Sequence, residues 1–411
     1  MKPSPKQQEY MDLEARYGAH NYKPLPVVLN KGKGTKVFDV DGNEYYDFLS
    51  AYSAVNQGHC HQKIVDALVD QANTLCLTSR AFYNDCLGEY EKYVTDLFGY
   101  DKLLPMNSGA EAVETAKKLA RKWAYEVKGV APDQAKIVCC EDNFHGRTIS
   151  IVSMSTDPDA YGNFGPFVPG IIKIPYNDVE ALEKVLQEDG EEVCAFLVEP
   201  IQGEAGVVVP DEGYLTACYD LCKKHNVLFV ADEVQTGIAR TGKMLACEHE
   251  GVRPDIVILG KALSGGVFPV SAVLADDDIM MTIRPGQHGS TYGGNPIACK
   301  VGMAALQVVI DEDLCERATV LGERFRQGLL DMNDENIELV RGKGLLNAAV
   351  IRAHDGKEAW DLCLLMAKYG VLAKQTHQHI VRFAPPLVIT EEELDDALER
   401  IKRAFAEYAK K

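Results

Sequence analysis

The sequence contains no long apolar run and no cluster of basic residues. No stretch of its 411 residues approaches the roughly 18 apolar residues that a membrane-spanning helix needs, so we expect no membrane partner. The formal net charge is −18 and lysines and arginines form no run, which argues against a nucleic acid partner. The first residues have neither the apolar core of a signal peptide nor the arginine-rich character of a transit peptide. We therefore expect a cytoplasmic protein, or a mitochondrial one if a presequence has been removed.

Several ligand-binding motifs are also missing. The 12 cysteines include no C-x-x-C pair, so we expect mostly buried thiols and no metal site. The segment His59-Cys60-His61 is no exception, because adjacent residues of an extended chain point to opposite sides. No G-x-G-x-x-G follows the first candidate strand, and Gly260-Lys261-Ala262 lacks the rest of a P-loop. These absences disfavour a nicotinamide-dependent enzyme and a P-loop NTPase.

Length and periodicity predict an α/β protein with more than one domain. Between residues 137 and 275 short apolar runs alternate with helical patterns, which is typical of a doubly wound sheet. A hairpin is expected around Asp41-Gly42, and the end of the chain is expected to form a small α+β domain. The candidate strands of the large sheet are 137–140, 171–174, 193–198, 227–231, 256–259 and 271–274, with helices at 178–188 and 212–225; in the last part of the chain, strands are expected near 345–351, 371–374 and 380–383, and helices near 358–369 and 391–408.

Two of these buried runs end abruptly in a charged residue. Asp232 follows the run 227–231, and Lys261 comes directly after 256–259 and Gly260. In open α/β sheets ligands bind beyond the carboxyl ends of the strands, so a carboxylate and an amine are expected at the edge of one cleft. This pair suits pyridoxal 5'-phosphate (PLP), which needs a lysine for its Schiff base and an acidic partner for its pyridine nitrogen. Two unrelated surface charges would give the same pattern.

A candidate phosphate site lies at residues 107–110. Ser108 and Glu111 form a capping-box pattern, and Val113, Ala116 and Ala120 follow at helical spacing. The segment is therefore expected to begin a helix whose free N–H groups favour an anion. An ordinary capped helix would have the same sequence.

Several longer motifs together resemble one family. They are Asp232-Glu233-Val234-Gln235-Thr236-Gly237, the lysine segment 259–266, the glycine-rich loop 289–296, and the segments 17–22, 55–61, 198–206 and 382–387. With 261 − 232 = 29 residues between the aspartate and the lysine, the chain resembles the class III PLP-dependent aminotransferases of fold type I, nearly end to end. The resemblance implies a large, mostly parallel sheet with helices on both faces and a small α+β domain built from both chain ends. We assign residues 1–62 to the N-terminal part of the small domain, 63–313 to the large PLP-binding domain and 314–411 to the C-terminal part of the small domain.

The resemblance also implies roles for individual residues around PLP. Lys261 is expected to hold the cofactor and to move a proton between the substrate and the cofactor, and Asp232 to pair with the pyridine nitrogen. The remaining expected cofactor contacts are Ser108, Gly109 and Ala110 at the phosphate, Phe144, Val234 and Gln235 around the ring, and Ser290 and Thr291 reaching the phosphate of the partner subunit in a homodimer. His145 departs from the ornithine-type members, which often have tryptophan there, and no catalytic role is assigned to it.

The substrates follow from the same resemblance, which is nearest to the ornithine-type members. These imply transfer of the δ-amino group of L-ornithine to 2-oxoglutarate, giving glutamate 5-semialdehyde and L-glutamate. N-acetylornithine and 4-aminobutyrate are alternative amino donors, and a non-catalytic scaffold protein with the same fold is an alternative of another class. The expected substrate contacts are Tyr22, Tyr52, Arg147, Glu199, Glu204 and Arg382, with Arg382 neutralised by Glu204 in one half-reaction; a plain structural ion pair is the alternative for those two.

Overall fold

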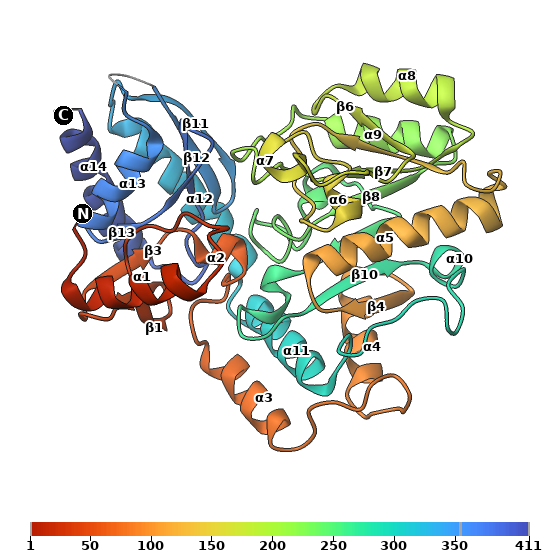
Figure 1. Ribbon diagram of the computed structural model, residues 1–411, viewed down its shortest axis with the longest axis horizontal. Coiled ribbons are helices and arrows are strands. Elements are labelled where there is room, and N and C mark those ends of the chain that lie inside the picture. Colours follow the sequence, from red (N-terminus) through yellow and green to blue (C-terminus); the bar gives the residue numbers. More distant parts are fainter. Residues whose placement is uncertain (1, 353–355, 410–411) are drawn as a thin grey trace.

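A computed structural model describes residues 2–352 and 356–409. Two bodies lie side by side in Figure 1, a large one built on the middle of the chain and a smaller one built on both chain ends. The N-terminal and C-terminal segments adjoin in the small body, because the C-terminal strand β13 (Val371–Leu372) pairs in parallel with β3 (Glu44–Asp47) of the N-terminal hairpin. The predicted fold class, with a small domain built from both ends of the chain, is confirmed.

In the described residues, the large body is organised on a seven-stranded sheet. Its order is β4-β10-β9-β8-β7-β5-β6, and β10 alone runs antiparallel to its neighbours. The six predicted strands are confirmed within two residues; the seventh, β4, was missed because it contains Pro105, which is tolerated there since β4 is an edge strand. The strands are β4 (Lys102–Met106), β5 (Lys136–Cys140), β6 (Ile171–Ile174), β7 (Val193–Val198), β8 (Leu228–Asp232), β9 (Ile256–Leu259) and β10 (Ser271–Ala275).

Helices cover both faces of this sheet. In β5, Ile137 and Cys139 pack into the cluster around α5 (Gly109–Trp123), whereas Val138 and Cys140 pack into the cluster around α8 (Val179–Asp189) and α9 (Tyr214–Lys224). Burial on two faces explains why these strands are apolar throughout rather than alternating. The other helices of this region are α3 (Gln62–Ala72), α4 (Leu87–Phe98), α11 (Pro296–Asp311) and the short α2 (Ser50–Ser53), α6 (Ile149–Val152), α7 (Pro158–Tyr161) and α10 (Asp277–Met280).

The small body contains two four-stranded sheets among the described residues. One has the order β1-β2-β3-β13 and the other β11-β12-β15-β14. The predicted strand 371–374 is wrong as a single element, because the chain changes sheet at Ala373. The remaining elements are β1 (Leu29–Lys33), β2 (Lys36–Asp39), β11 (Ile337–Lys343), β12 (Leu346–Ile351), β14 (Lys374–Thr376) and β15 (Ile380–Phe383), with helices α1 (Pro5–Tyr17), α12 (Leu314–Asp331), α13 (Ala359–Lys368) and α14 (Glu391–Tyr408).

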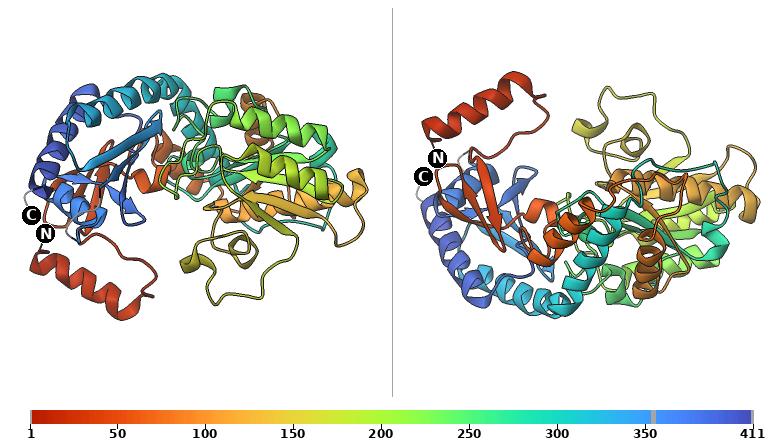
Figure 2. Two further views of the ribbon diagram at one scale, coloured as in Figure 1. Left: turned by 90° about the horizontal axis from the view of Figure 1, so that it is seen from above. Right: turned by 90° about the horizontal axis from the view of Figure 1, so that it is seen from below.

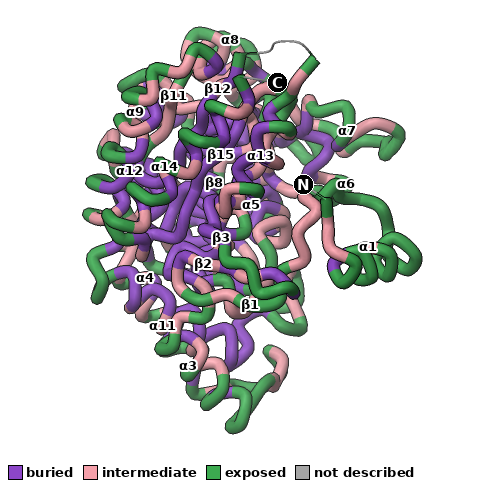
Figure 3. The backbone as a smooth tube through the Cα atoms, turned by 90° about the vertical axis from the view of Figure 1, so that its left-hand side faces the viewer, coloured by how far each residue is buried: buried purple, intermediate pink, exposed green. Residues whose placement is uncertain are grey.

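Burial follows this organisation. The central strands β7, β8, β9 and β10 of the large sheet are buried throughout, whereas helix α1 is exposed along almost its whole length (Figure 3). Helix α1 and the segment around α7 project from the same side of the molecule (Figure 2). Of the 12 cysteines, all but Cys60, Cys76 and Cys315 are buried, and all are free thiols, which confirms the prediction of mostly buried thiols. Within residues 2–352 and 356–409, no helix is both long and apolar enough to cross a membrane.

Candidate active site

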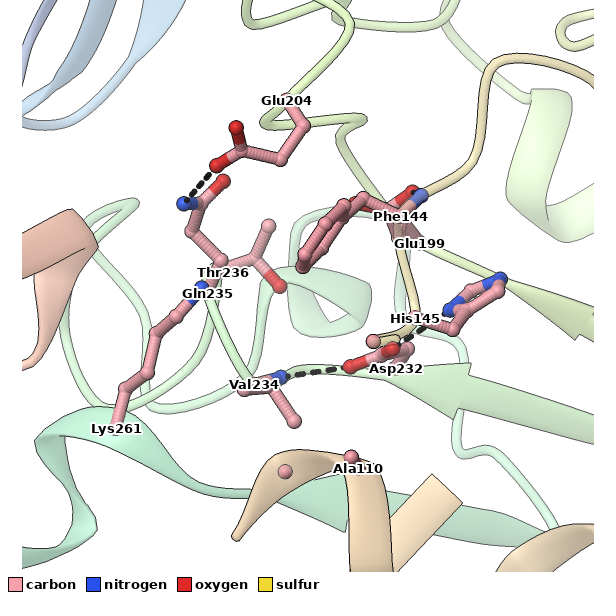
Figure 4. A pocket seen from close by; sticks show the side chains of 12 residues that line it. Ala110, Phe144, His145, Glu199, Glu204, Asp232, Val234, Gln235, Thr236 and Lys261 are labelled. Carbon is pink, nitrogen blue, oxygen red and sulfur yellow. Dashed lines mark hydrogen bonds and ion pairs between the residues drawn. The ribbon is translucent and has the colours of Figure 1, made fainter. Parts of the chain in front are cut away.

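A pocket lies beyond the carboxyl ends of β7, β8 and β9, where an open α/β sheet places its ligands (Figure 4). It brings together most of the predicted cofactor residues with two of the predicted substrate residues. The pocket is lined by Gly109, Ala110, Phe144, His145, Gly146, Glu199, Glu204, Asp232, Val234, Gln235, Thr236 and Lys261.

Asp232 is the last residue of β8, and its carboxylate is 4% exposed. Its Oδ1 accepts the backbone N–H of Val234 at 3.1 Å. Its Oδ2 lies 2.7 Å from Nδ1 of His145, whose side chain is fully buried. A carboxylate so far from water needs such partners. Each oxygen has one, which leaves further lone pairs facing the pocket.

Lys261 follows Gly260 directly after β9 and opens a 3₁₀ turn, Lys261–Ser264. Its φ of +44° is left-handed, a conformation that costs a non-glycine residue on the order of 1–3 kcal/mol and is concentrated at functional sites. Burial lowers the pKa of the Lys261 amine below its ordinary value, while the carboxylates of Glu204 and Asp232 act in the opposite sense. The side chain extends into the pocket toward Gln235 (Figure 4). A buried amine with a lowered pKa is suited to act as a nucleophile and a base.

The N-terminus of α5 forms one wall of the pocket. Ser108 caps the helix, and the predicted capping box with Glu111 is present. A Cβ added at Gly109 would lie 3.1 Å from Cγ1 of Val234, so only glycine leaves the chain this close to the pocket without displacing its neighbour. The wall presents free backbone N–H groups and the positive end of the helix dipole, the features that bind a phosphate.

Glu204 and Arg382 form an ion pair at the edge of the pocket. Arg382 Nη1 lies 2.6 Å from Glu204 Oε1, and its guanidinium carbon lies 5.3 Å from the centre of the Tyr52 ring. Burial alone would raise the pKa of Glu204, but the guanidinium more than offsets it, so that this pKa lies below its ordinary value. Arg382 is 5% exposed. The arrangement is a buried cation whose charge one carboxylate masks.

Glu199 lies deeper, at the end of β7. Its Oε2 accepts the backbone N–H of Phe144 at 3.0 Å, and burial raises the pKa of its carboxyl to about 7. The sequence predicted a substrate contact here. The structure places Glu199 in the lining of the pocket, with its carboxylate against the backbone of the segment that carries Phe144 and His145, and the substrate contact stays a prediction.

Five predicted residues besides Ser108 and Arg382 lie outside the lining of this pocket. Arg147 is exposed and lines a neighbouring cavity that shares Phe144, His145, Gly146 and Glu204 with the first. Tyr22, 78% exposed, and Tyr52 line a third cavity against the N-terminal hairpin. Ser290 Oγ accepts Nδ2 of Asn107 at 2.9 Å, beside the helix that begins at Gly109, whereas Thr291 is exposed. Glu199 and Glu204, the other two substrate candidates, lie in the first pocket itself.

Three residues that line the pocket had no predicted role there: His145, Gly146 and Thr236. His145 was singled out in the sequence only as a departure, since its partner lies 87 positions away. Thr236 donates its hydroxyl to Glu233 and could have been noted from its place directly after Gln235. Gly203, outside the pocket lining, was also missed: a Cβ there would lie 1.3 Å from Gln235 Oε1. Sequence alone carries no signal for such a close approach.

Comparison with known proteins identifies relatives over nearly the full length. Residues 17–405 match the family model "Aminotransferase class-III". The ornithine aminotransferase car2 of Schizosaccharomyces pombe is 60% identical over 403 residues, which cover 96% of this chain and 92% of that protein. The family match includes every residue that lines the pocket.

Solved structures of aminotransferases are also similar to this chain over nearly its full length. The ornithine aminotransferase of Toxoplasma gondii superposes with a TM-score of 0.96 at 49% identity, over 98% of this chain and 96% of that one; another structure of that enzyme holds PLP at partial occupancy in its active site. A structure described as the acetylornithine aminotransferase of Elizabethkingia anophelis is 59% identical with a TM-score of 0.90, over 99% of this chain and 100% of that one.

Proposed function

The chain belongs to the class-III aminotransferase family, and on that premise we propose that it is a PLP-dependent transferase that moves the δ-amino group of L-ornithine to 2-oxoglutarate. The products are glutamate 5-semialdehyde and L-glutamate. The two half-reactions alternate in one site. Relatives of 60% and 58% identity that are ornithine aminotransferases support the choice of amino donor.

The residues of the pocket fit PLP. The Phe144 ring and the Val234 side chain face each other across open space, with Lys261 and Asp232 at two other sides (Figure 4). Gly109 and Ala110 would hold the phosphate, Asp232 the pyridine nitrogen, and Gln235 the phenolic oxygen. When bound, PLP draws electrons away from the substrate carbon that carries the transferred amine.

The chain itself supplies positioning and proton transfer. Lys261 would hold the cofactor and, once released by the incoming amine, would move a proton at the substrate carbon from its Nζ. Its lowered pKa makes the neutral amine, which is the base, more abundant near neutral pH. Asp232 would pair with the ring nitrogen and oppose its positive charge.

The observation that carries the proposal is the Glu204–Arg382 pair at 2.6 Å. One site must accept the δ-amine end of ornithine in the first half-reaction and the dicarboxylate 2-oxoglutarate in the second. With Arg382 masked by Glu204, its guanidinium would not repel the δ-ammonium group. When 2-oxoglutarate arrives, a turn of Glu204 would free the guanidinium to bind the α-carboxylate in a bidentate manner.

The remaining predicted residues would hold the far ends of the substrates. Tyr22 and Tyr52, at the third cavity, would bind the α-carboxylate and α-amine of ornithine, so that the δ-amine points to Lys261. Arg147, at the neighbouring cavity, would bind the distal carboxylate of 2-oxoglutarate. Tyr52, which is half-buried, would contribute to discrimination, because a wrong substrate would leave its hydroxyl unpaired.

We also propose a homodimer that shares its active sites. Large apolar side chains are exposed on α1 (Tyr10, Leu13 and Tyr17) and on the segment with Phe82 and Tyr83, the last two exposed by 73% and 104%. Exposed apolar groups of this size are typical of an interface. Thr291, exposed in one chain, would reach the phosphate of the second. Light scattering after gel filtration should give twice 45.3 kDa.

A substrate panel tests the choice of amino donor. Rates are measured with 2-oxoglutarate and either ornithine, N-acetylornithine or 4-aminobutyrate. We expect the highest kcat/KM for ornithine. N-acetylornithine is the second candidate, favoured by the 59% identity to the Elizabethkingia anophelis structure; a higher kcat/KM for it, or for 4-aminobutyrate, would replace ornithine as the donor.

A scaffold protein without turnover is the alternative of another class. It is disfavoured by the presence of both Lys261 and Asp232 in one pocket. The visible absorption of the purified protein separates the two. An enzyme shows a PLP band that ornithine removes and 2-oxoglutarate restores, whereas a scaffold shows no such cycle.

A further inference from the structure

Arg147, proposed above to bind the distal carboxylate of 2-oxoglutarate, belongs to a segment that runs along helix α5. Residues 146–150 lead from the pocket into the short helix α6, which lies beside α5 (Figure 1). Gly146 is so close to α5 that a Cβ there would lie 3.0 Å from the Cβ of Ala110. Its φ of +128° is one that other residues rarely adopt. The chain directly before Arg147 is therefore held against the first turn of α5.

Two hydroxyl groups hold the chain on the other side of Arg147. Thr148 and Ser150 both donate to the carboxylate of Glu114, one to each oxygen. The bond from Ser150 is 2.8 Å long. Glu114 is half-buried and lies one turn after Ala110 on the same face of α5. Arg147 thus stands between two attachments to one helix, although its own side chain is exposed.

Lys117 supports the attachment from the next turn of α5. The residue is 5% exposed, and its ammonium group donates both to the carbonyl oxygen of Ser150, at 2.8 Å, and to the hydroxyl of Ser150. A buried cation needs such partners. Ser150 in turn donates to Glu114, so one hydroxyl joins the ammonium group to the carboxylate. Hydrogen bonds to ionised groups are stronger than neutral ones, which suits this cluster to a rigid connection.

We propose that Glu114 is a positioning residue, which fixes Arg147 relative to the cofactor and thereby selects a dicarboxylate of the length of 2-oxoglutarate. Helix α5 carries both the proposed phosphate contacts at its N-terminus and the Glu114 anchor. The separation between Arg147 and the cofactor is therefore set within one rigid element. Glu114 touches neither substrate nor cofactor in this role. The inference deepens the proposed function and rests on it for the roles of Arg147 and of the N-terminus of α5.

The two half-reactions should respond differently when the anchor is loosened. Arg147 has a proposed part only in the half-reaction with 2-oxoglutarate, so the half-reaction with ornithine should be spared. Oxaloacetate, a dicarboxylate one carbon shorter, fits the fixed separation less well and has less to lose. Loosening the anchor should therefore reduce the preference for 2-oxoglutarate over oxaloacetate, an effect that general damage to the fold would not produce.

Matched substitutions separate the hydrogen bonds from packing. T148V replaces the hydroxyl with a methyl group and T148S keeps the hydroxyl. Because Thr148 also caps α6, E114A is included, since it removes the acceptor and leaves that cap in place. T319V makes the same change at an exposed threonine of α12 and is the control. Melting temperatures are measured for all four variants.

Stopped-flow absorbance of each holoprotein gives kcat/KM for ornithine, 2-oxoglutarate and oxaloacetate, and calorimetry gives the dissociation constant of 2-oxoglutarate from the PLP form, which does not turn it over. Small displacements of a positioning group have large effects on rate, so kcat/KM for 2-oxoglutarate should fall about fivefold or more in E114A and T148V. The dissociation constant should rise in parallel. Both should change less than about twofold in T148S and T319V.

A double-mutant cycle tests whether Glu114 acts through Arg147. R147M removes the guanidinium, so that nothing remains for Glu114 to position. Adding E114A to R147M should then reduce kcat/KM for 2-oxoglutarate by less than about twofold further, because the two residues are coupled.

The outcomes are distinct. A loss confined to the dicarboxylates, with a reduced preference over oxaloacetate and no further loss in the double variant, supports the proposal. Equal losses with ornithine and 2-oxoglutarate, an unchanged preference over oxaloacetate, equal losses in T148S and T148V, or additive losses in the double variant overturn it, and leave the proposed function intact. A wild-type protein that transfers no amino group to 2-oxoglutarate overturns both.

Discussion

The Oε1 atom of Glu204 and the Nη1 atom of Arg382 lie 2.6 Å apart, although 178 residues separate them in the chain. The pair joins a loop after β7 to strand β15 of the small body. Because the pair lies at the edge of the pocket, the orientation of the Glu204 side chain decides whether the charge of Arg382 is neutralised or is free to bind a substrate. The pKa of Glu204 lies below its ordinary value, so the masking persists as pH falls to the range where free glutamates become protonated.

E204Q should uncouple the two half-reactions. Glutamine cannot neutralise the guanidinium, so the δ-ammonium of ornithine meets a free cation, whereas 2-oxoglutarate meets a site that is already open. We expect kcat/KM for ornithine to fall about tenfold or more, equivalent to about 1.4 kcal/mol, and the 2-oxoglutarate half-reaction to change little. Stopped-flow absorbance measures each half-reaction alone. The exposed Glu212 gives the control E212Q, and equal losses in both half-reactions of E204Q would refute the switch.

K261A should abolish turnover without unfolding the protein. The variant removes the amine that holds PLP and the base that moves the proton, and general base catalysis alone contributes about 10²–10⁴-fold. Alanine is no better suited than lysine to the left-handed φ of +44° at position 261, so the free energy of unfolding should change little. Transaminase assays and melting curves measure the two effects. K300A, which removes a surface partner of Glu89, is the control, and retained activity in K261A would contradict the assignment.

G203A should weaken PLP binding more than it weakens the fold. The new Cβ would lie 1.3 Å from Gln235 Oε1, and the end of that flexible side chain must move away from the ring position. The dissociation constant of PLP should rise several-fold while the melting temperature stays nearly constant. Gly88, on helix α4, has open space around its Cβ position. G88A should therefore leave PLP binding unchanged and should stabilise the helix by about 0.5–1 kcal/mol; an identical effect of the two variants would count against the contact.

R240M tests how the two bodies are joined. The guanidinium of Arg240 is completely buried and donates to the carbonyls of Leu345 and Pro385 and to the Asn56 side chain. Methionine leaves these acceptors unpaired, at about 1–3 kcal/mol each, so the free energy of unfolding should fall by about 3 kcal/mol or more. R324M, which breaks an exposed pair with Asp395, should cost less than about 1 kcal/mol. Urea titration measures both, and a small loss in R240M would show that the junction does not depend on these bonds.

The protonation of Glu199 should make the free energy of unfolding depend on pH. Burial raises its carboxyl pKa from 4.5 to about 7, so the folded protein keeps a proton that the unfolded chain releases in this window. Its contribution is complete below pH 4.5 and is lost as the pH rises through about 7. E199Q should therefore gain stability relative to wild type between pH 5 and pH 8, by on the order of 2 kcal/mol. Urea titrations at the two pH values measure the difference, and parallel pH curves would contradict it.

The strands that position the site were predictable because each is an apolar run with a charged end. Buried on both faces, β8 and β9 need no alternation to be recognised, and their adjacency places Asp232 and Lys261 in one pocket. Strand β1 was missed because its residues are mostly polar and exposed. It forms a strand because it pairs with β2. Tertiary pairing, not local propensity, decides such elements.

The contacts between the residues of the site were harder to predict from the sequence than the residues that form it. His145 meets Asp232 only because the segment after β5 crosses the end of β8, and no spacing in the sequence encodes that approach. Arg147 lines an adjoining cavity rather than the pocket, and its guanidinium carbon lies 5.7 Å from the centre of the Phe144 ring. The assignments of individual roles stay predictions, and so do the boundaries at residues 62 and 313.

Isotope transfer tests the central claim most directly. Ornithine labelled with ¹⁵N at its δ-amine is incubated with the protein and unlabelled 2-oxoglutarate, and the glutamate formed is analysed by mass spectrometry. If Lys261, Asp232 and the Glu204–Arg382 pair act as described, the label appears in glutamate, and ornithine labelled at the α-amine gives none. Label from the α-amine, or no labelled glutamate from either substrate, would contradict the account.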